Sequence, residues 1–135
     1  MRACVKAAAA LARQRGIPFH TDAVQAGGAL SIKVRDLNVD FLSLSAHKFY
    51  GPKGIGVLYA RKGVPFWTLQ TGGSQESKRR AGTENLPYII GLAKALELAY
   101  ADLEGTNTRV QALRDRLVAG LLERIPETEL SGHPT

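Results

Sequence analysis

The 135-residue sequence contains a single cysteine, Cys4, and few aromatic residues. One cysteine cannot form a disulfide within the chain and excludes a metal site built from several cysteines. No hydrophobic run approaches the roughly 18 residues that a membrane-spanning helix requires. The Ala-rich stretch after Lys6 is interrupted by Arg13 and Arg15, unlike the core of a signal peptide. We therefore expect a soluble, cytoplasmic protein with no membrane segment.

Positive charge predominates: 18 Lys and Arg against 12 Asp and Glu give a formal net charge of +6. The basic residues are nevertheless scattered, and their only tight cluster is residues 78–80. Aromatic side chains do not alternate with basic ones as they do in surfaces that stack nucleic-acid bases. We interpret the charge as a solvated surface and expect no nucleic-acid partner.

Hydrophobic periodicity and chain breakers predict an α/β protein. A helix is expected over residues 3–15, with Gly16 as its stop and Pro18 preventing its continuation. Three strands are predicted, the first of them short and buried: Ile17–Thr21, Phe41–Ser45 and Ile55–Ala60.

The second half of the chain reads as an irregular segment followed by helices. Residues 61–84 are long for a loop in a compact domain, and such loops are often functional. A helix should follow with Pro87 in its first turn, capped from Thr83–Asn85. Its apolar face is predicted to be Ile89, Ile90, Ala93, Leu96 and Ala99. A last helix is predicted over residues 107–124, with Val110, Leu113, Leu117 and Leu121 at helical spacing.

Polar side chains follow two of the predicted strands. Asp22 and Gln25 come after the first strand, and His47 and Lys48 after the second. Ligands of open α/β sheets bind beyond the carboxyl ends of the strands. This set suits pyridoxal phosphate (PLP), which needs a lysine to hold its aldehyde as an imine and an acid to keep its ring nitrogen protonated. Gln25 suits the phenolic oxygen, and Ser45 with His47 can donate to the phosphate.

Two segments resemble the cofactor signatures of class-V aminotransferase-type PLP enzymes: HTDAVQ at 20–25 and SAHKFYGPKG at 45–54. GGSQE at 72–76 and RAGTEN at 80–85 narrow the resemblance to the cysteine desulfurases, which supply sulfur for iron–sulfur clusters. The resemblance runs along nearly the whole chain, with its motifs in the family's order. It implies that residues 1–104 are part of the large domain of a fold-type I PLP enzyme, a mostly parallel sheet flanked by helices, and that residues 105–135 lead into the small domain.

Carried over residue by residue, the family pattern makes Lys48 the catalytic Schiff-base lysine and Asp22 the partner of the pyridine nitrogen. Gln25 would bond the phenolic oxygen, and Ser45 with His47 would hold the phosphate. The reaction implied converts L-cysteine to L-alanine and passes the sulfur to an acceptor or to an iron–sulfur scaffold protein. No metal site is expected.

Thr83 matches a threonine that, in this family, reaches the phosphate bound by the other subunit, so the resemblance implies a homodimer. The family's nucleophilic cysteine lies on a mobile loop further C-terminal. A phosphate loop and a histidine that stacks on the ring lie further N-terminal. None of these is in this sequence, and Cys4, on the first helix, does not replace the nucleophile. We therefore expect a portion cut at both ends and inactive by itself.

Several alternatives remain open. The parent enzyme could be another class-V aminotransferase or lyase, or the chain could be a non-catalytic fragment. Asp22 and Thr83 could serve as helix caps, and His20 suits a hydrogen-bonded structural histidine. Arg80 could bind a carboxylate through two hydrogen bonds, or could belong to a solvated charge run.

Overall fold

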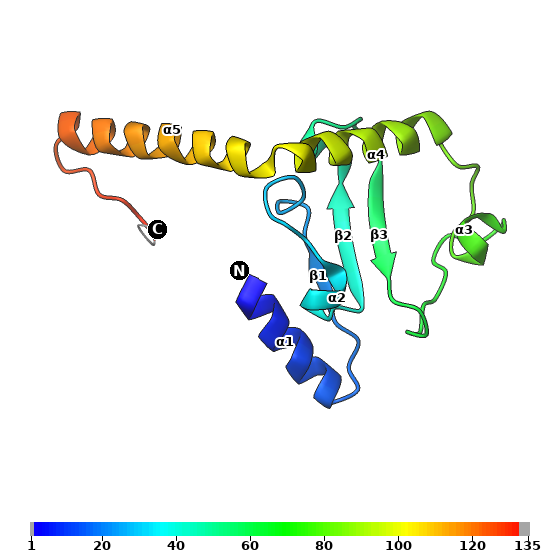
Figure 1. Ribbon diagram of the computed structural model, residues 1–135. Coiled ribbons are helices and arrows are strands. Elements are labelled where there is room, and N and C mark those ends of the chain that lie inside the picture. The colour runs from blue at the N-terminus through cyan, green and yellow to red at the C-terminus, as the bar shows by residue number, and fades with distance from the viewer. Residues whose placement is uncertain (1, 133–135) are drawn as a thin grey trace. The chain divides into compact units, whose positions relative to one another are not determined.

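The computed structural model describes residues 2–132 and separates into two compact units, residues 1–101 and 102–135. Residues 133–135, the end of the second predicted domain, lie outside the described residues. The helices of the first unit are α1 (Arg2–Gln14), α2 (Val34–Leu37), the 3-10 turn η1 (Ala46–Phe49), α3 (Gln75–Lys78) and α4 (Leu86–Ala101). Its strands are β1 (His20–Asp22), β2 (Phe41–Ser45) and β3 (Gly56–Ala60). The second unit contains α5 (Leu103–Arg124) (Figure 1).

The three strands form one mixed sheet in the order β1-β2-β3. β1 pairs with β2 in parallel, with Asp22 opposite Ser43, whereas β2 pairs with β3 antiparallel, with Ser45 opposite Gly56. The expectation of a mostly parallel sheet therefore holds for the first pair only. A parallel pair needs a crossover of about a dozen residues or more, and the link from β2 to β3 is shorter. β1 and β2 thus end, and β3 begins, at the same edge.

The first helix ends where glycine allows it to. Gly16 has φ +65°, and its N–H donates to Arg13 O, while the N–H of Ile17 reaches Ala12 O at 3.0 Å. This pattern is a Schellman cap, so Ile17 closes the helix and does not start a strand. Pro18 has no N–H to offer to a sheet. β1 consequently begins three residues later than predicted, and the expected burial is wrong, because Ile17 is 55% exposed.

Two small clusters of buried side chains form the core. The first contains Ala9, Ala23, Ala26, Leu37, Val39 and Leu42. The second contains Ala46, Phe49 and Leu92, and the half-buried Leu44 packs against both clusters. Leu42 and Leu44 lie on one face of β2, so this face carries the core. Alternation along the strands then places Asp22, Ser43 and Ser45 together on the opposite face.

Helix α4 covers the turn that follows β2. Its side chains Leu92, Ala95, Leu96 and Ala99 pack in the cluster of Ala46 and Phe49. Gly91 permits a close approach, because a Cβ there would lie 2.8 Å from Cγ of Pro52. The predicted apolar face was right for Leu96 and Ala99 but wrong for Ile90, which is 68% exposed.

Asp40 is the buried charge of the first unit, with 8% of its surface exposed. Its Oδ1 accepts a hydrogen bond from Arg13 at 3.2 Å and forms an ion pair with Arg61 Nε at 3.1 Å. Its Oδ2 accepts the N–H of Phe19 at 3.0 Å. Arg61 also donates to Val39 O at 2.8 Å. One carboxylate therefore joins α1, the entry to β1, the start of β2 and the residue after β3.

Helix α5 begins at Leu103, one turn earlier than predicted. Its four predicted apolar residues do lie along the helix, but they are 42–62% exposed: Val110, Leu113, Leu117 and Leu121. Within residues 2–132, no helix is long and apolar enough to cross a membrane. The prediction that residues 1–104 and 105–135 belong to different domains of a larger enzyme stays a prediction.

We expect Asp40→Ala to lower the free energy of unfolding by about 2–3 kcal/mol, because it strips two guanidinium groups and one N–H of a common acceptor. The loss should fall short of the roughly 3–5 kcal/mol typical of fully buried pairs, since the arginines reach water. Urea unfolding followed by circular dichroism measures it. Asp36→Ala, at an exposed position of α2, is the control and should change stability by no more than about 0.5 kcal/mol. Equal midpoints for the two variants would contradict this role for Asp40.

Candidate active site

The pairing of β1 with β2 brings two predicted site segments to one edge. The N–H of Ala23 donates to Ser43 O at 3.0 Å, which continues the ladder one residue beyond β1. Residues 22–25 and 45–48 therefore leave adjacent strands side by side. The N–H of Ala46 donates to Ile55 O at 3.1 Å, so the glycine-containing turn before β3 closes at the same edge.

Asp22 is exposed and has one oxygen in use. Its Oδ1 accepts the N–H of Val24 at 2.9 Å. This Asx turn supports the local capping role that the sequence left open. Its Oδ2 has no hydrogen-bond partner among the described residues, so one oxygen remains for a ligand. The turn also fixes the direction of the carboxylate, and the capping and ligand roles are compatible.

Ser45 and His47 contact each other directly. Ser45 Oγ and His47 Nδ1 are 2.9 Å apart, which leaves Nε2 of the exposed imidazole available. A second imidazole–hydroxyl pair lies on the same face of the sheet, where His20 Nε2 is 2.8 Å from Ser43 Oγ. His20 therefore lies in β1 as a hydrogen-bonded residue, in agreement with the structural interpretation of this histidine.

Lys48 is exposed on η1, between residues that are fixed. Its neighbour Phe49 is 1% exposed, and Ala46, at the start of the turn, is fully buried. Tyr50 ends the turn in the left-handed region with φ 64°. Gly51 follows because a Cβ there would lie 2.9 Å from Ala46 Cβ and 3.0 Å from Ala46 O. The side chain of Lys48 thus extends from a turn in which Ala46 and Phe49 are buried in the core.

A contact that the sequence did not reveal joins the two segments. Gln25 is exposed on the turn after β1, and Gly27 and Gly28 end that turn against Phe49. A Cβ on Gly28, which has φ +75°, would lie 2.7 Å from Cβ of Phe49. Local sequence identifies the pair Gly27–Gly28 only as a chain breaker. The sequence feature that could have indicated this contact is the pair of adjacent glycines shortly after Asp22 and Gln25.

Thr83 is the predicted site residue that the described contacts do not connect to the other five. It is exposed, and the N-cap of α4 is Asn85, whose Oδ1 accepts the N–H of Tyr88 at 3.3 Å. The alternative that Thr83 caps this helix is therefore wrong. Pro87 does lie in the first turn, as expected.

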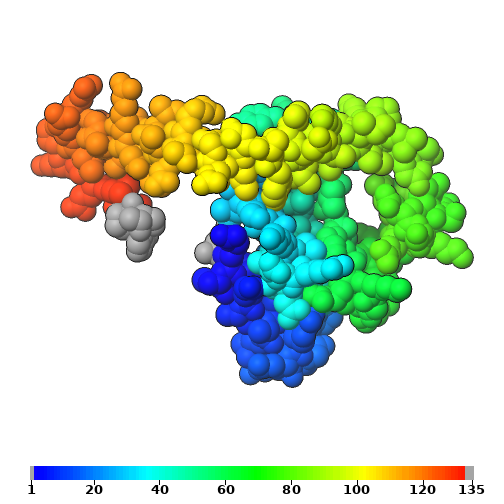
Figure 2. All heavy atoms as spheres, viewed as in Figure 1, coloured from blue at the N-terminus to red at the C-terminus, as the bar shows by residue number. Residues whose placement is uncertain are grey.

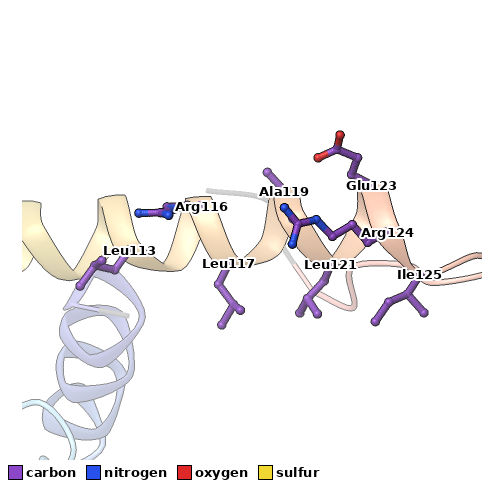
Figure 3. A pocket seen from close by; sticks show the side chains of 9 residues that line it. Leu113, Arg116, Leu117, Ala119, Leu121, Glu123, Arg124 and Ile125 are labelled. Atoms are coloured by element: carbon purple, nitrogen blue, oxygen red, sulfur yellow. The ribbon is translucent and has the colours of Figure 1, made fainter.

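A hollow of about 750 Å³ lies along α5, lined mainly by apolar side chains (Figure 3). Leu113, Leu117, Leu121 and Ile125 point to one side of the helix there, while Arg116 and Glu123 point elsewhere. A smaller hollow of about 40 Å³ touches Asp22. Size alone therefore does not locate the chemistry, and the edge of the sheet remains the candidate site.

The groups at this edge fit PLP. An exposed amine, a carboxylate with a free oxygen, an amide, a hydroxyl and an imidazole with one open nitrogen come from two adjacent loops. The residues are Lys48, Asp22, Gln25, Ser45 and His47. Within residues 2–132, no cluster of His, Cys, Asp and Glu could hold a metal ion.

Comparisons with known proteins find cysteine desulfurases similar to this chain. The cysteine desulfurase IscS of Methanosarcina thermophila is 57% identical over 131 residues, covering 97% of this chain and 32% of the relative. A cysteine desulfurase of Sinorhizobium fredii is 54% identical over 126 residues, covering 93% of this chain and 33% of the relative.

Solved structures show the same likeness. A NifS-like protein superposes with a TM-score of 0.84 at 41% identity, covering 88% of this chain and 33% of that one. SspA in complex with cysteine gives a TM-score of 0.65 at 47% identity, covering 69% and 27%. The chain thus spans about a third of the length of its relatives. The family model for class-V aminotransferases matches residues 2–135. This chain therefore belongs to the class-V aminotransferase family, a PLP-dependent family that includes the cysteine desulfurases it is similar to.

Proposed function

We propose that this chain is the PLP-binding part of a cysteine desulfurase, which converts L-cysteine to L-alanine and passes the sulfur on for iron–sulfur cluster assembly. The observation that carries the proposal is the parallel pairing of β1 with β2, because it places Asp22 and Lys48 on adjacent loops at one edge. Relatives that are cysteine desulfurases, and a similar structure solved with cysteine, support the substrate.

Five residues would hold the cofactor. Lys48 Nζ would attach it covalently, and Asp22 Oδ2 would pair with the ring nitrogen. Gln25 would donate to the phenolic oxygen. His47 Nε2 would donate to the phosphate, since Nδ1 of His47 already contacts Ser45. Ser45 Oγ, which has a single hydrogen, would donate to the phosphate in place of its contact with Nδ1. When bound, PLP withdraws electrons from the Cα of an amino-acid substrate.

The geometry of the chain suits Lys48 for proton transfer. Once the substrate amine has displaced it, the Nζ of Lys48 is free to take the proton from the substrate Cα. The turn that carries Lys48 is fixed by the buried side chains of Phe49 and Ala46, so the backbone of Lys48 stays at this edge of the sheet. The Asx turn at Asp22 keeps the carboxylate aimed while Oδ1 is occupied by Val24.

Sulfur transfer needs a thiolate that attacks the sulfur of the substrate. Cys4 is the sole cysteine of the sequence. It lies on α1, which precedes both site-bearing segments along the chain. The proposal therefore assigns this nucleophile to a residue outside these 135. It includes a homodimer, in which the exposed Thr83 reaches the phosphate bound by the other copy, and a protein that accepts the sulfur.

In the complete version of the protein, Lys48→Ala should abolish covalent attachment of the cofactor while leaving the fold intact, because the side chain is exposed and no described contact depends on it. The visible absorption band of the PLP-bound protein measures the attachment, and circular dichroism measures the fold. Lys53→Ala, at an exposed position of the following turn, is the matched control and should keep the band. A Lys48→Ala protein that retained both the band and turnover of cysteine would remove Lys48 from the site.

Asp22→Asn should leave PLP bound but slow turnover by at least about a hundredfold, since each ~1.4 kcal/mol of lost stabilisation is tenfold in rate. An amide keeps an oxygen for Val24 but cannot hold the ring nitrogen protonated. Steady-state alanine release, with PLP content measured in parallel, tests this. Asp36→Asn is the control, and near-wild-type rates for Asp22→Asn would show that the assignment is wrong.

Residues 1–135 alone should release no alanine from cysteine and should lose PLP on dialysis. The reasons are that Lys48, Gln25 and Asp22 are open to solvent and that the nucleophile is missing. The visible spectrum before and after dialysis, and an alanine assay, are the measurements. Stoichiometric PLP after dialysis would contradict the first expectation. Alanine formation that disappeared in Cys4→Ala would make Cys4 the nucleophile after all.

A further inference from the structure

The segment between β3 and α4 contains an exposed loop, residues 68–82, that is closed by its own hydrogen bonds. We call it the clasped loop. Thr68 Oγ1 donates to Lys78 O at 2.8 Å, and the N–H of Ala81 donates to Gln70 O at 2.8 Å. Its two arms are therefore bonded to each other. Figure 2 shows the residues after β3 in green, on the surface of the first unit.

Arg80 connects the two arms of the clasped loop through its side chain. Nη2 donates to Oε1 of Gln70 at 3.1 Å, and Nε donates to Ala81 O at 3.2 Å. Both acceptors are amide oxygens within the loop. Lys78 and Arg79, in contrast, have no side-chain hydrogen bond or ion pair among residues 2–132. Arg80 is thus distinct from the solvated charges beside it.

These contacts fix the chain immediately before Thr83. Ala81 is 7% exposed, and both its N–H and its carbonyl are bonded. The N–H of Gly82 donates to Oε1 of Gln75 at 3.1 Å, with the glycine at φ +104°. Two residues beyond Thr83, Asn85 caps α4. Thr83 is therefore an exposed hydroxyl held between two anchored points.

The same geometry bears on whether Arg80 binds a substrate carboxylate. Such a contact would use two adjacent N–H groups of the guanidinium in parallel. The side formed by Nε and Nη2 is already occupied by Ala81 O and Gln70 Oε1. Binding a carboxylate on that side would break the clasp, whereas Nη1 has no hydrogen-bond partner among residues 2–132.

We propose that Arg80 is a positioning residue, which clasps the loop and so presents the hydroxyl of Thr83 to the phosphate of PLP bound by a second copy of the chain. The proposal rests on the proposed function for the role of Thr83. The clasp itself does not depend on that function and can be tested separately.

Amide hydrogen exchange of the chain without PLP tests the clasp. Gln70→Ala and Arg80→Ala should each speed exchange at Ala81 and Gly82 by about tenfold, the scale of one lost hydrogen bond to a charged group. Gln70→Glu, which keeps an oxygen for Arg80, should exchange like the wild type. Unchanged exchange within β2 shows that the fold is intact. Unchanged exchange at Ala81 and Gly82 in both alanine variants would overturn the clasp.

The PLP-loaded dimer tests what the clasp does. Arg80→Ala and Gln70→Ala should each weaken PLP binding by roughly tenfold with the KM for cysteine unchanged at saturating PLP, and Gln70→Glu should restore binding. A raised KM in Arg80→Ala but not in Gln70→Ala would overturn the proposal and make Arg80 a substrate ligand. Failure of the complete wild-type protein, as a dimer, to bind PLP would refute the proposed function and the role of Thr83, while the exchange result would still decide the clasp.

Discussion

The arrangement of the first unit depends on the carboxylate of Asp40. Burying a charge costs free energy unless its hydrogen-bonding capacity is filled, and here both oxygens are filled by groups from distant parts of the chain. The partners are Arg13, Arg61 and Phe19. They bring the end of α1, the start of β1 and the end of β3 to the start of β2. With the sheet fixed at that end, the directions in which the strands leave the other end are determined. The candidate site occupies that other end.

At the end of the sheet that carries the candidate site, close packing at glycines, and not a buried charge, holds the segments together. Gly28 lies against Phe49, and Gly91 lies against Pro52. Each glycine removes a side chain that would otherwise hold two loops, or a loop and a helix, further apart. Phe49 is therefore in contact with the turn that carries Gln25 and belongs to the turn that carries Lys48. Polar site residues can stay exposed because apolar residues next to them in sequence are buried.

The sequence predicted those features that depend on neighbouring residues, such as strand bounds and helix ends. The bounds of β2 were right, and Gly16 ended α1 as its conformational freedom suggests. Asp22 and Lys48 were expected just beyond the ends of two strands, and the parallel pairing of β1 with β2 brings those two ends side by side. β1 was misplaced because Ile17 was needed to cap a helix, a competing use of its N–H that hydrophobicity does not reveal.

Contacts between distant segments could not be predicted in this way. Local patterns do not reveal the roles of Asp40 and Gly28, because the partners of these residues lie 21 or more residues away in the sequence. The apolar face of α4 was partly wrong for a similar reason: periodicity identifies apolar positions, but the turn that α4 covers determines which of them are buried. The sequence could not decide the role of Arg80, because Lys78 and Arg79 beside it carry the same charge. Only the structure shows that Arg80 alone of the three forms side-chain hydrogen bonds within the described loop.

The hydrogen bond from Ala46 to Ile55 has a consequence for binding cost. It closes the turn that carries Lys48 at its base, so the ends of this loop are held together by the sheet before any ligand arrives. Closing a loop costs chain entropy, and here that cost is met when β3 pairs with β2. A molecule that reacts with Lys48 consequently has side-chain rotamers to order but need not close this loop. The antiparallel third strand, which carries none of the predicted site residues, thereby increases the affinity available at the edge.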